Sequence, residues 1–187
     1  MNKAEAAKRL FNEMLYVLGE EELKDVSAAS ILKDLYDCHH CVRYIAQMYC
    51  KGIIGASEKN AAVFDLNENV SALVFKEWQE RLYNKKLRIV PKPVKFEGVK
   101  FMTRSELEGK SMVNYETLVI NLGEKDLLLN HAKNIKSSLQ EIKLNPYGVS
   151  DDRIRPVILV CDYGIKSQLA AGILSKSGYR DITVVLP

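Results

Sequence analysis

Hydrophobic residues in the first half of the chain recur with the three- and four-residue spacing of amphipathic helices. This spacing predicts helices over residues 3–19, 27–49 and 68–86. Asn67 is the expected N-cap of the third helix. The apolar stripe of the second helix comprises Ile31, Leu35, Cys38, Val42, Ile45 and Tyr49. The inward-facing residues of the third are Val70, Leu73, Val74, Trp78 and Leu82. Three such helices predict a small antiparallel helical bundle over residues 1–90.

The second half of the chain follows a different pattern, in which short apolar runs alternate with helical stretches. Residues 91–97 form an expected linker, because two prolines between basic residues disfavour helix there. The strands predicted after it cover residues 99–102, 118–122, 157–160 and 182–186. A helix is predicted over residues 166–177, and residues 126–142 are expected to be mainly helical or irregular. Short strands with intervening helices predict an α/β fold, with a parallel sheet and flanking helices over residues 98–187.

The composition of the chain narrows the function classes. Its 187 residues include 27 Lys and Arg against 24 Asp and Glu, so the formal net charge is only +3. Such a balance predicts no polybasic surface for nucleic acid. No apolar run reaches the ~20 residues that a membrane span needs, and the N-terminal segment lacks the apolar core of a secretory signal. We therefore expect a cytoplasmic protein that binds neither nucleic acid nor a membrane.

Three of the four cysteines lie close together early in the chain. Without a secretory signal, reduced thiols are the expected state of all four. The run Cys38-His39-His40-Cys41 combines the spacing of a redox dithiol with the residue types of a zinc site. On one continuous helix these side chains and Cys50 point in different directions, so they do not converge on one ion. The simplest interpretation is a core Cys38 beside exposed histidines, with no metal bound.

Two alternatives for this early cluster stay open. If Asp37 caps a new helix, Cys38 lies in its first turn and Cys41 one turn on, as in a redox dithiol. Otherwise Cys38 and Cys41 supply two metal ligands, and distant residues or another chain supply the rest. His131 is one candidate for such a distant ligand.

The fourth cysteine, Cys161, stands in a different setting. Four apolar residues, 157–160, lead into it, and a helical pattern follows that stops at Gly178. The loop that begins with it reads Cys161-Asp162-Tyr163-Gly164-Ile165-Lys166-Ser167. The pattern predicts a thiol at the end of a buried strand, in a tight loop before a helix N-terminus. Backbone N–H groups and the helix dipole favour an anion there, and with it the nucleophilic thiolate.

The segment from residue 156 to 185 resembles the rhodanese family. It shares the apolar strand, the Cys161 loop with Gly164 in its middle, and Ser167 at the opening of the helix. The residues that continue the likeness through that helix are Ala170, Ala171, Leu174, Gly178 and Tyr179. In all, the resemblance covers about residues 98–187.

The resemblance continues upstream, with departures from the family's pattern. Residues 103–107 (TRSEL) look like the family's opening segment, and His131 falls where the family often has a histidine. The sequence Asn-Leu-Gly at residues 121–123 stands where the family often has Asp-x-Arg. Asp162 follows the cysteine directly, and a carboxylate there disfavours the thiolate and repels an anionic donor.

The resemblance implies a sulfurtransferase that needs no cofactor. The Cys161 thiolate would attack the outer sulfur of a small donor such as thiosulfate, hold it as a persulfide, and pass it to cyanide or to a protein thiol. The residues implied to ring that sulfur are Asp162, Tyr163, Gly164, Ile165, Lys166 and Ser167. Their backbone N–H groups would stabilise its negative charge. Lys166 would bind an anionic donor or simply be solvated, and Ser167 would cap the helix or donate a hydrogen bond.

Other functions are compatible with parts of the same sequence. A cysteine-dependent phosphatase needs an arginine six residues after its cysteine, and Ser167 occupies that position here. This reading is therefore set aside. The alternative within the rhodanese resemblance is a non-catalytic module that recognises a partner protein together with the helical half. The third hypothesis is the thiol-redox or metal-binding role of Cys38 and Cys41.

Overall fold

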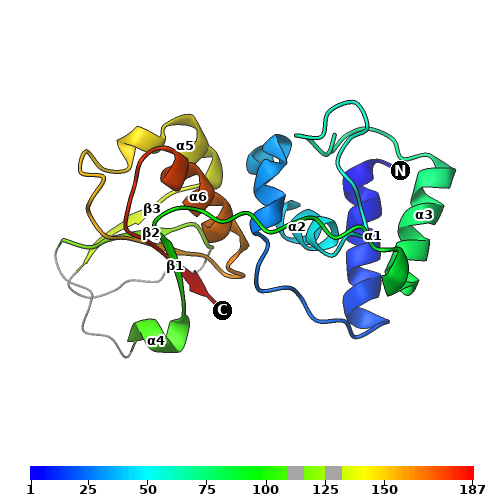
Figure 1. The fold of residues 1–187 in the computed structure, drawn as a ribbon, viewed down its shortest axis with the longest axis horizontal. Coiled ribbons are helices and arrows are strands. Elements are labelled where there is room, and N and C mark those ends of the chain that lie inside the picture. The colour runs from blue at the N-terminus through cyan, green and yellow to red at the C-terminus, as the bar shows by residue number, and fades with distance from the viewer. Residues whose placement is uncertain (109–115, 125–131) are drawn as a thin grey trace. The chain divides into compact units, whose positions relative to one another are not determined.

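The computed structural model describes residues 1–108, 116–124 and 132–187. The chain divides into two compact units, Met1–Val94 and Lys95–Pro187 (Figure 1). The division falls inside the segment that the sequence indicates as a linker. Across the described residues, no helix is both long enough and apolar enough to cross a membrane.

The first unit is built from helices and turns. Its α-helices are α1 (Lys3–Tyr16), α2 (Val42–Cys50) and α3 (Ala72–Tyr83). Its 3₁₀ helices are η1 (Ser27–Ile31), η2 (Lys33–Asp37) and η3 (Lys85–Leu87). α1 starts in a capping box, because the Asn2 side chain accepts the N–H of Glu5 and the Glu5 carboxylate accepts the N–H of Asn2. α1 packs against both α2 and α3, and it buries Ala6, Ala7, Leu10, Phe11 and Met14.

The helix expected over residues 27–49 is wrong in its first half, where η1 and η2 replace it. The backbone is extended at Leu32 and Cys38, which ends each of these 3₁₀ helices. A long-range contact favours this path, because the Asp34 carboxylate accepts the backbone N–H groups of residues 64 and 65, each at 2.9 Å. Consequently Cys38 does not lie on a helical stripe.

The third helix is shorter than the sequence predicts. α3 begins at the N-cap Ser71 rather than at Asn67, because residues 68–70 bond to the N-terminal segment of the chain instead. Trp78 and Leu82 are buried, as expected. Leu73 of this helix is expected to face inward but is exposed, and the same holds for Ile31 of the second predicted helix.

Within the described residues, the second unit is an α/β fold with a five-stranded parallel sheet in the order β1-β5-β4-β2-β3. The expected parallel α/β class is therefore confirmed. The strands are β1 (Val99–Thr103), β2 (Leu118–Asn121), β3 (Lys133–Lys136), β4 (Val157–Val160) and β5 (Ile182–Leu186). The helices are α4 (Arg104–Glu108), α5 (Leu139–Leu144), α6 (Ile165–Lys176) and the 3₁₀ helix η4 (Pro146–Gly148). β2 and β4 are buried at every position, as central strands of a parallel sheet are.

Of the residues predicted to be mainly helical or irregular, 126–131 lie outside the described part of the chain, and the prediction is wrong at β3. This strand pairs with β2 at one end of the sheet order, and its sequence Lys-Asn-Ile-Lys lacks the apolar run that marks a buried strand. It is a strand because it is hydrogen-bonded to β2, and its amino-acid composition does not favour a strand. α5, in the same stretch, is helical as expected.

In the sheet, β2 and β4 are neighbours, but the strands that follow them in the chain lie on opposite sides of this pair. From β2 the chain continues to β3, and from β4 it passes through α6 to β5 on the other side. Figure 1 shows α6 lying along the sheet beside α5. In open α/β sheets, ligands bind outside the carboxyl ends of two such neighbouring strands. The loops after β2 and β4 are therefore the place where a site is expected.

Candidate functional site

Cys161 lies directly after β4, at the carboxyl end where β4 and β2 are neighbours. The pairing of the two strands continues to this point, because the Leu122 N–H donates to the Val160 carbonyl at 2.8 Å. Cys161 is a free thiol with a half-buried side chain. Cys161 is therefore neither enclosed in the core nor fully exposed to solvent.

Gly164 turns the chain between β4 and α6. It is the N-cap of α6 and has a φ of 70°, in the left-handed region that favours glycine. An added Cβ would lie 3.0 Å from Pro187 Cδ and 3.4 Å from Leu186 Cδ2. Both the backbone conformation and the available space therefore favour glycine, and the turn brings the start of α6 back to Cys161.

The first turn of α6 contacts the Cys161 sulfur. The Ser167 N–H donates to Cys161 Sγ with an N···S distance of 3.4 Å, and Ser167 Oγ lies 3.1 Å from the same atom. Gly164 has no side chain that could cap α6, so the sulfur accepts one of the N–H groups that a helix N-terminus leaves without an intrahelical partner. A thiolate or persulfide at this position gains that hydrogen bond together with the positive end of the helix dipole.

The Ser167 hydroxyl can serve both charge states of the thiol. Ser167 is fully buried, and its hydroxyl also lies 3.2 Å from the Gly164 carbonyl oxygen. With a neutral thiol, the hydroxyl donates to that carbonyl and accepts a hydrogen bond from S–H. With a thiolate, its single proton turns to the sulfur, which then has two donors from one residue.

The Asp162 carboxylate faces the loop after β2. Its Oδ2 accepts the Glu124 N–H at 2.9 Å, and a Cβ added at Gly123 would lie 3.0 Å from the same oxygen. Asn121 supports this turn, since its Oδ1 accepts the Gly123 N–H at 2.9 Å. The residues that depart from the rhodanese pattern thus join the ends of β2 and β4. Sequence reasoning missed this link, for which the glycine at position 123 is the one available signal.

Three other residues of the loop differ in their burial. Ile165 is buried in the first turn of α6, and Lys166 is half-buried. Tyr163 is 53% exposed, so it stands at the solvent side of the loop. His131, which aligns with the family's histidine, lies outside the described residues.

Cys38 and Cys41 form a disulfide, with 5.6 Å between their Cα atoms. The expectation that all four cysteines are reduced is therefore wrong for these two, whereas Cys50 and Cys161 are free. The cause is local geometry, because Cys38 ends η2, Cys41 is the N-cap of α2, and the turn between them brings the sulfurs together. The alternative in which Asp37 caps a helix that contains Cys38 is also wrong, since α2 begins after Cys41.

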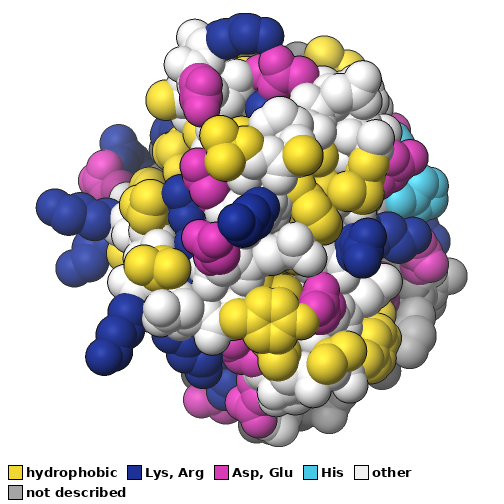
Figure 2. Space-filling view, turned by 90° about the vertical axis from the view of Figure 1, so that its right-hand side faces the viewer, with side chains coloured by type: hydrophobic (Ala, Val, Ile, Leu, Met, Phe, Trp, Pro, Cys, Tyr) yellow, Lys and Arg dark blue, Asp and Glu magenta, His cyan; other side chains and the backbone are white. Residues whose placement is uncertain are grey.

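The two histidines between these cysteines lie in an exposed turn. His39 and His40 are both exposed, and the third histidine of the chain is outside the described residues, so the histidine surface in Figure 2 is theirs. Among the described residues, no three His, Cys, Asp or Glu side chains gather as a metal site. With their sulfurs bonded to each other, Cys38 and Cys41 are not available as metal ligands in this form.

Cys50 has a different character from the other cysteines. It is the last residue of α2 and is buried. Burial raises the pKa of its thiol to about 12, so it stays neutral at physiological pH. Because the thiolate is the reactive form, Cys50 is a core residue rather than a nucleophile.

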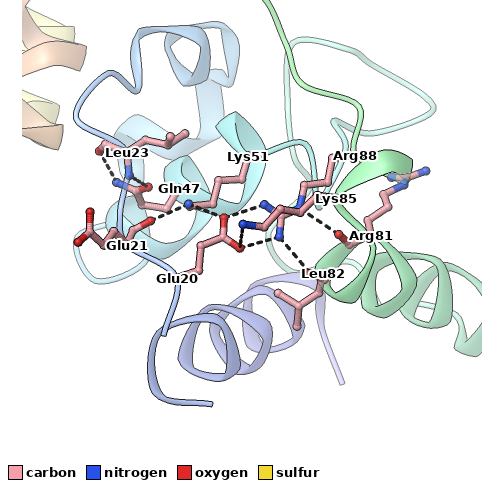
Figure 3. Close-up of polar contacts among 9 residues, drawn as sticks. All are labelled: Glu20, Glu21, Leu23, Gln47, Lys51, Arg81, Leu82, Lys85 and Arg88. Carbon is pink, nitrogen blue, oxygen red and sulfur yellow. Dashed lines mark hydrogen bonds and ion pairs between the residues drawn. The ribbon is translucent and has the colours of Figure 1, made fainter. Parts of the chain in front are cut away.

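An ion-pair cluster around Glu20, which sequence reasoning missed, ties the first unit together (Figure 3). Arg88 contacts both carboxylate oxygens of Glu20 at 2.7 Å, and Lys51 Nζ donates to Oε1 at 2.8 Å. The hydrogen bonds from Arg88, and then those from Lys51, lower the pKa of the Glu20 carboxyl from 4.5 to about 2. Arg88 also donates to two carbonyl groups at the end of α3. The cluster therefore links the segment after α1 to α2 and α3.

Two cysteine sites thus stand out in the described part of the chain: a free thiol held by the start of α6, and a disulfide before α2. No protein-family model matches this chain, and no curated protein shows significant similarity to it.

Proposed function

We propose that the chain is a rhodanese-type sulfurtransferase that carries sulfur as a persulfide on Cys161. The observation that carries this proposal is the pair of contacts from Ser167 to Cys161 Sγ, with the N–H at 3.4 Å and the hydroxyl at 3.1 Å. Both groups belong to Ser167, which follows the Gly164 turn in the first turn of α6, where anions are favoured. The same loop carries the sequence resemblance to the rhodanese family.

In the first half-reaction, the Cys161 thiolate attacks the outer sulfur of a donor such as thiosulfate. A bond forms between Cys161 Sγ and that sulfur, the S–S bond of the donor breaks, and sulfite leaves with the electron pair. The Ser167 N–H and hydroxyl stabilise the thiolate before the attack. The positive end of the α6 dipole would then stabilise the negative outer sulfur of the persulfide.

In the second half-reaction, the thiolate of an acceptor attacks the outer sulfur of the persulfide. A new S–S bond forms on the acceptor, the bond to Cys161 breaks, and the Cys161 thiolate leaves toward the Ser167 donors. The cycle needs no cofactor. Both the acceptor and Cys161 react as thiolates, so these two thiols must be reduced for the cycle to run.

The position of Asp162 bears on the choice of donor. Its carboxylate is exposed next to the thiol, and the Glu124 N–H compensates its charge in part. The remaining negative charge repels a dianion such as thiosulfate more than it repels a donor that carries a single charge. A persulfide on another protein is therefore expected to load Cys161 faster than thiosulfate does.

Intact-mass measurement after incubation with sulfur donors tests the proposal. The expected result is a gain of one sulfur atom, which is lost in Cys161→Ser and removed by an acceptor thiol. Cys50→Ser is the matched control, because Cys50 is also a free thiol but is buried. If neither thiosulfate nor a protein persulfide transfers sulfur to Cys161, sulfur transfer is ruled out. The non-catalytic binding module is then the remaining rhodanese-like function.

A further inference from the structure

We infer that the Cys38–Cys41 disulfide of the first unit is a redox-active pair, which oxidises a dithiol substrate through Cys38. This activity goes beyond sulfur transfer and does not rest on it, because it uses different sulfurs in a different unit of the chain. Three observations support it: the unequal burial of the two cysteines, the hydrogen bond to Cys38, and the short span that the disulfide closes.

The two cysteine residues differ in their exposure to solvent. Cys41 is only 2% exposed, whereas Cys38 is half-buried at the end of η2. The turn beside Cys38 carries the exposed side chains of His39 and His40. An incoming thiol therefore reaches Cys38 first, which fixes Cys38 as the attacked sulfur and Cys41 as the leaving one.

The start of α2 stabilises negative charge on Cys38. The Cys41 N–H donates to Cys38 Sγ at 3.1 Å, and it comes from the N-cap of a nine-residue helix. A thiolate gains more from this donor and from the helix dipole than a disulfide sulfur does, because it carries a full charge. The reduced pair is therefore favoured, and the disulfide passes readily to a substrate dithiol.

The disulfide contributes little as a constraint on the chain. It joins residues three positions apart, and the stabilisation that a disulfide gives by restricting the unfolded chain falls as its loop shortens. The first unit has other long-range links, such as the ion pairs of Glu20 with Lys51 and Arg88. A stabilising role thus explains this disulfide less well than an exchange role.

The exchange proceeds in two steps that balance. One thiolate of the substrate attacks Cys38 Sγ, a mixed disulfide forms, and the bond to Cys41 breaks. Cys41 leaves with the electron pair and takes up a proton from water. The second thiolate of the substrate then attacks its own sulfur in the mixed disulfide, and Cys38 leaves as a thiolate beside the Cys41 N–H. The substrate loses two electrons and the cysteine pair gains them.

The test uses the full chain with Cys161→Ser, so that no second accessible thiol interferes. The probe is a reduced synthetic peptide with two cysteines separated by two residues, mixed with the oxidised protein without urea. We expect one disulfide in the peptide for each Cys38–Cys41 pair reduced. In the same Cys161→Ser background, we then compare two further variants, each of which keeps one cysteine of the pair. The variant with Cys41→Ser should form an adduct with oxidised glutathione at Cys38 about tenfold faster than the variant with Cys38→Ser forms one at Cys41.

Two results overturn the inference. The first is a disulfide that reacts with the peptide only after urea unfolds the chain. The second is equal adduct formation at the two cysteines. If either serine variant fails to fold, the same ranking is read from the reduced chain without substitutions at 38 and 41. Brief alkylation followed by peptide mapping should then label Cys38 about tenfold faster than Cys41.

Discussion

The two cysteine sites share one kind of hydrogen bond, from a backbone N–H to the sulfur, and differ in the side chain next to that sulfur. In both, a backbone N–H at the start of a helix donates to the sulfur, from Ser167 to Cys161 and from Cys41 to Cys38. At Cys161 the second neighbour is a buried hydroxyl, so the sulfur stays free and can hold a transferred atom. At Cys38 it is the sulfur of Cys41, to which Cys38 is bonded, and such a pair allows a two-electron exchange. The helix start favours the thiolate at both sites, and the neighbouring side chain selects the chemistry.

The largest expected effect is a complete separation of the two activities. Cys161→Ser should abolish sulfur loading and leave peptide oxidation unchanged, because Cys161 takes no part in the disulfide exchange. Cys38→Ser should do the opposite. Intact mass measures sulfur loading, and alkylation mapping measures exchange. Loss of both activities in either variant would contradict the division of chemistry between the two sites.

The second effect concerns the hydroxyl that distinguishes the Cys161 site. Ser167→Ala should slow sulfur loading by about tenfold to a hundredfold, because the thiolate loses one of its two donors from this residue. Single-turnover loading followed by mass spectrometry measures the rate. Ser175→Ala is the control, since Ser175 lies on the same helix and its hydroxyl donates to the Glu97 carbonyl. A rate that falls equally in both variants would mean that the hydroxyl acts only through the stability of α6.

The third effect concerns the ion-pair cluster of Glu20. This cluster links α2, the helix after the disulfide, to the rest of the first unit. Arg88→Met should lower the free energy of unfolding by about 2 kcal/mol, because the half-buried Glu20 carboxylate loses both hydrogen bonds from Arg88 and keeps only its lysine partners. Urea unfolding followed by the fluorescence of Trp78, the only tryptophan, reports on this unit. Lys86→Met is the control, since Lys86 lies in the same turn but is exposed.

The same cluster makes the stability of the first unit depend on acid. The pKa of the Glu20 carboxyl is about 2 in the folded chain against an ordinary value of 4.5. Since the folded-state pKa is the lower one, the stabilisation is fully present above about pH 5 and is lost as the pH falls toward 2. The difference in urea midpoint between the wild type and Glu20→Gln should shrink over this range. Glu21→Gln should show no such change, because Glu21 enters the cluster through its backbone carbonyl.

The smallest effect concerns the turn that delivers the α6 donors to Cys161. Gly164→Ala should lower the free energy of unfolding by about 1–2 kcal/mol for its left-handed backbone, with an added penalty from the contact with Pro187. Gly19→Ala is the matched control, because Gly19 has a φ of 60° and nothing within 4 Å of an added Cβ. Equal losses in the two variants would show that the contact with Pro187 contributes nothing.

Much of the second unit could be predicted from sequence, and less of the first. The apolar runs of β2, β4 and β5 identify them as strands, because buried parallel strands need continuous hydrophobic surface. β3 could not be predicted, since a polar strand depends on hydrogen bonds to its neighbour. In the first unit, the apolar spacing over residues 27–49 fits one helix, but the long-range hydrogen bonds of Asp34 favour two short 3₁₀ helices instead.

Two features can be predicted from the linear chain, namely the parallel α/β class of the second unit and the placement of Cys161 between a strand and a helix. Both follow from local patterns of apolar residues and glycine. Three contacts become visible only in the folded chain, namely the hydrogen bond from the Ser167 N–H to Cys161, the one from the Glu124 N–H to Asp162, and the Cys38–Cys41 disulfide. These contacts depend on how the backbone turns between elements and on which chain segments meet. A linear pattern of hydrophobic and polar residues does not record either of these.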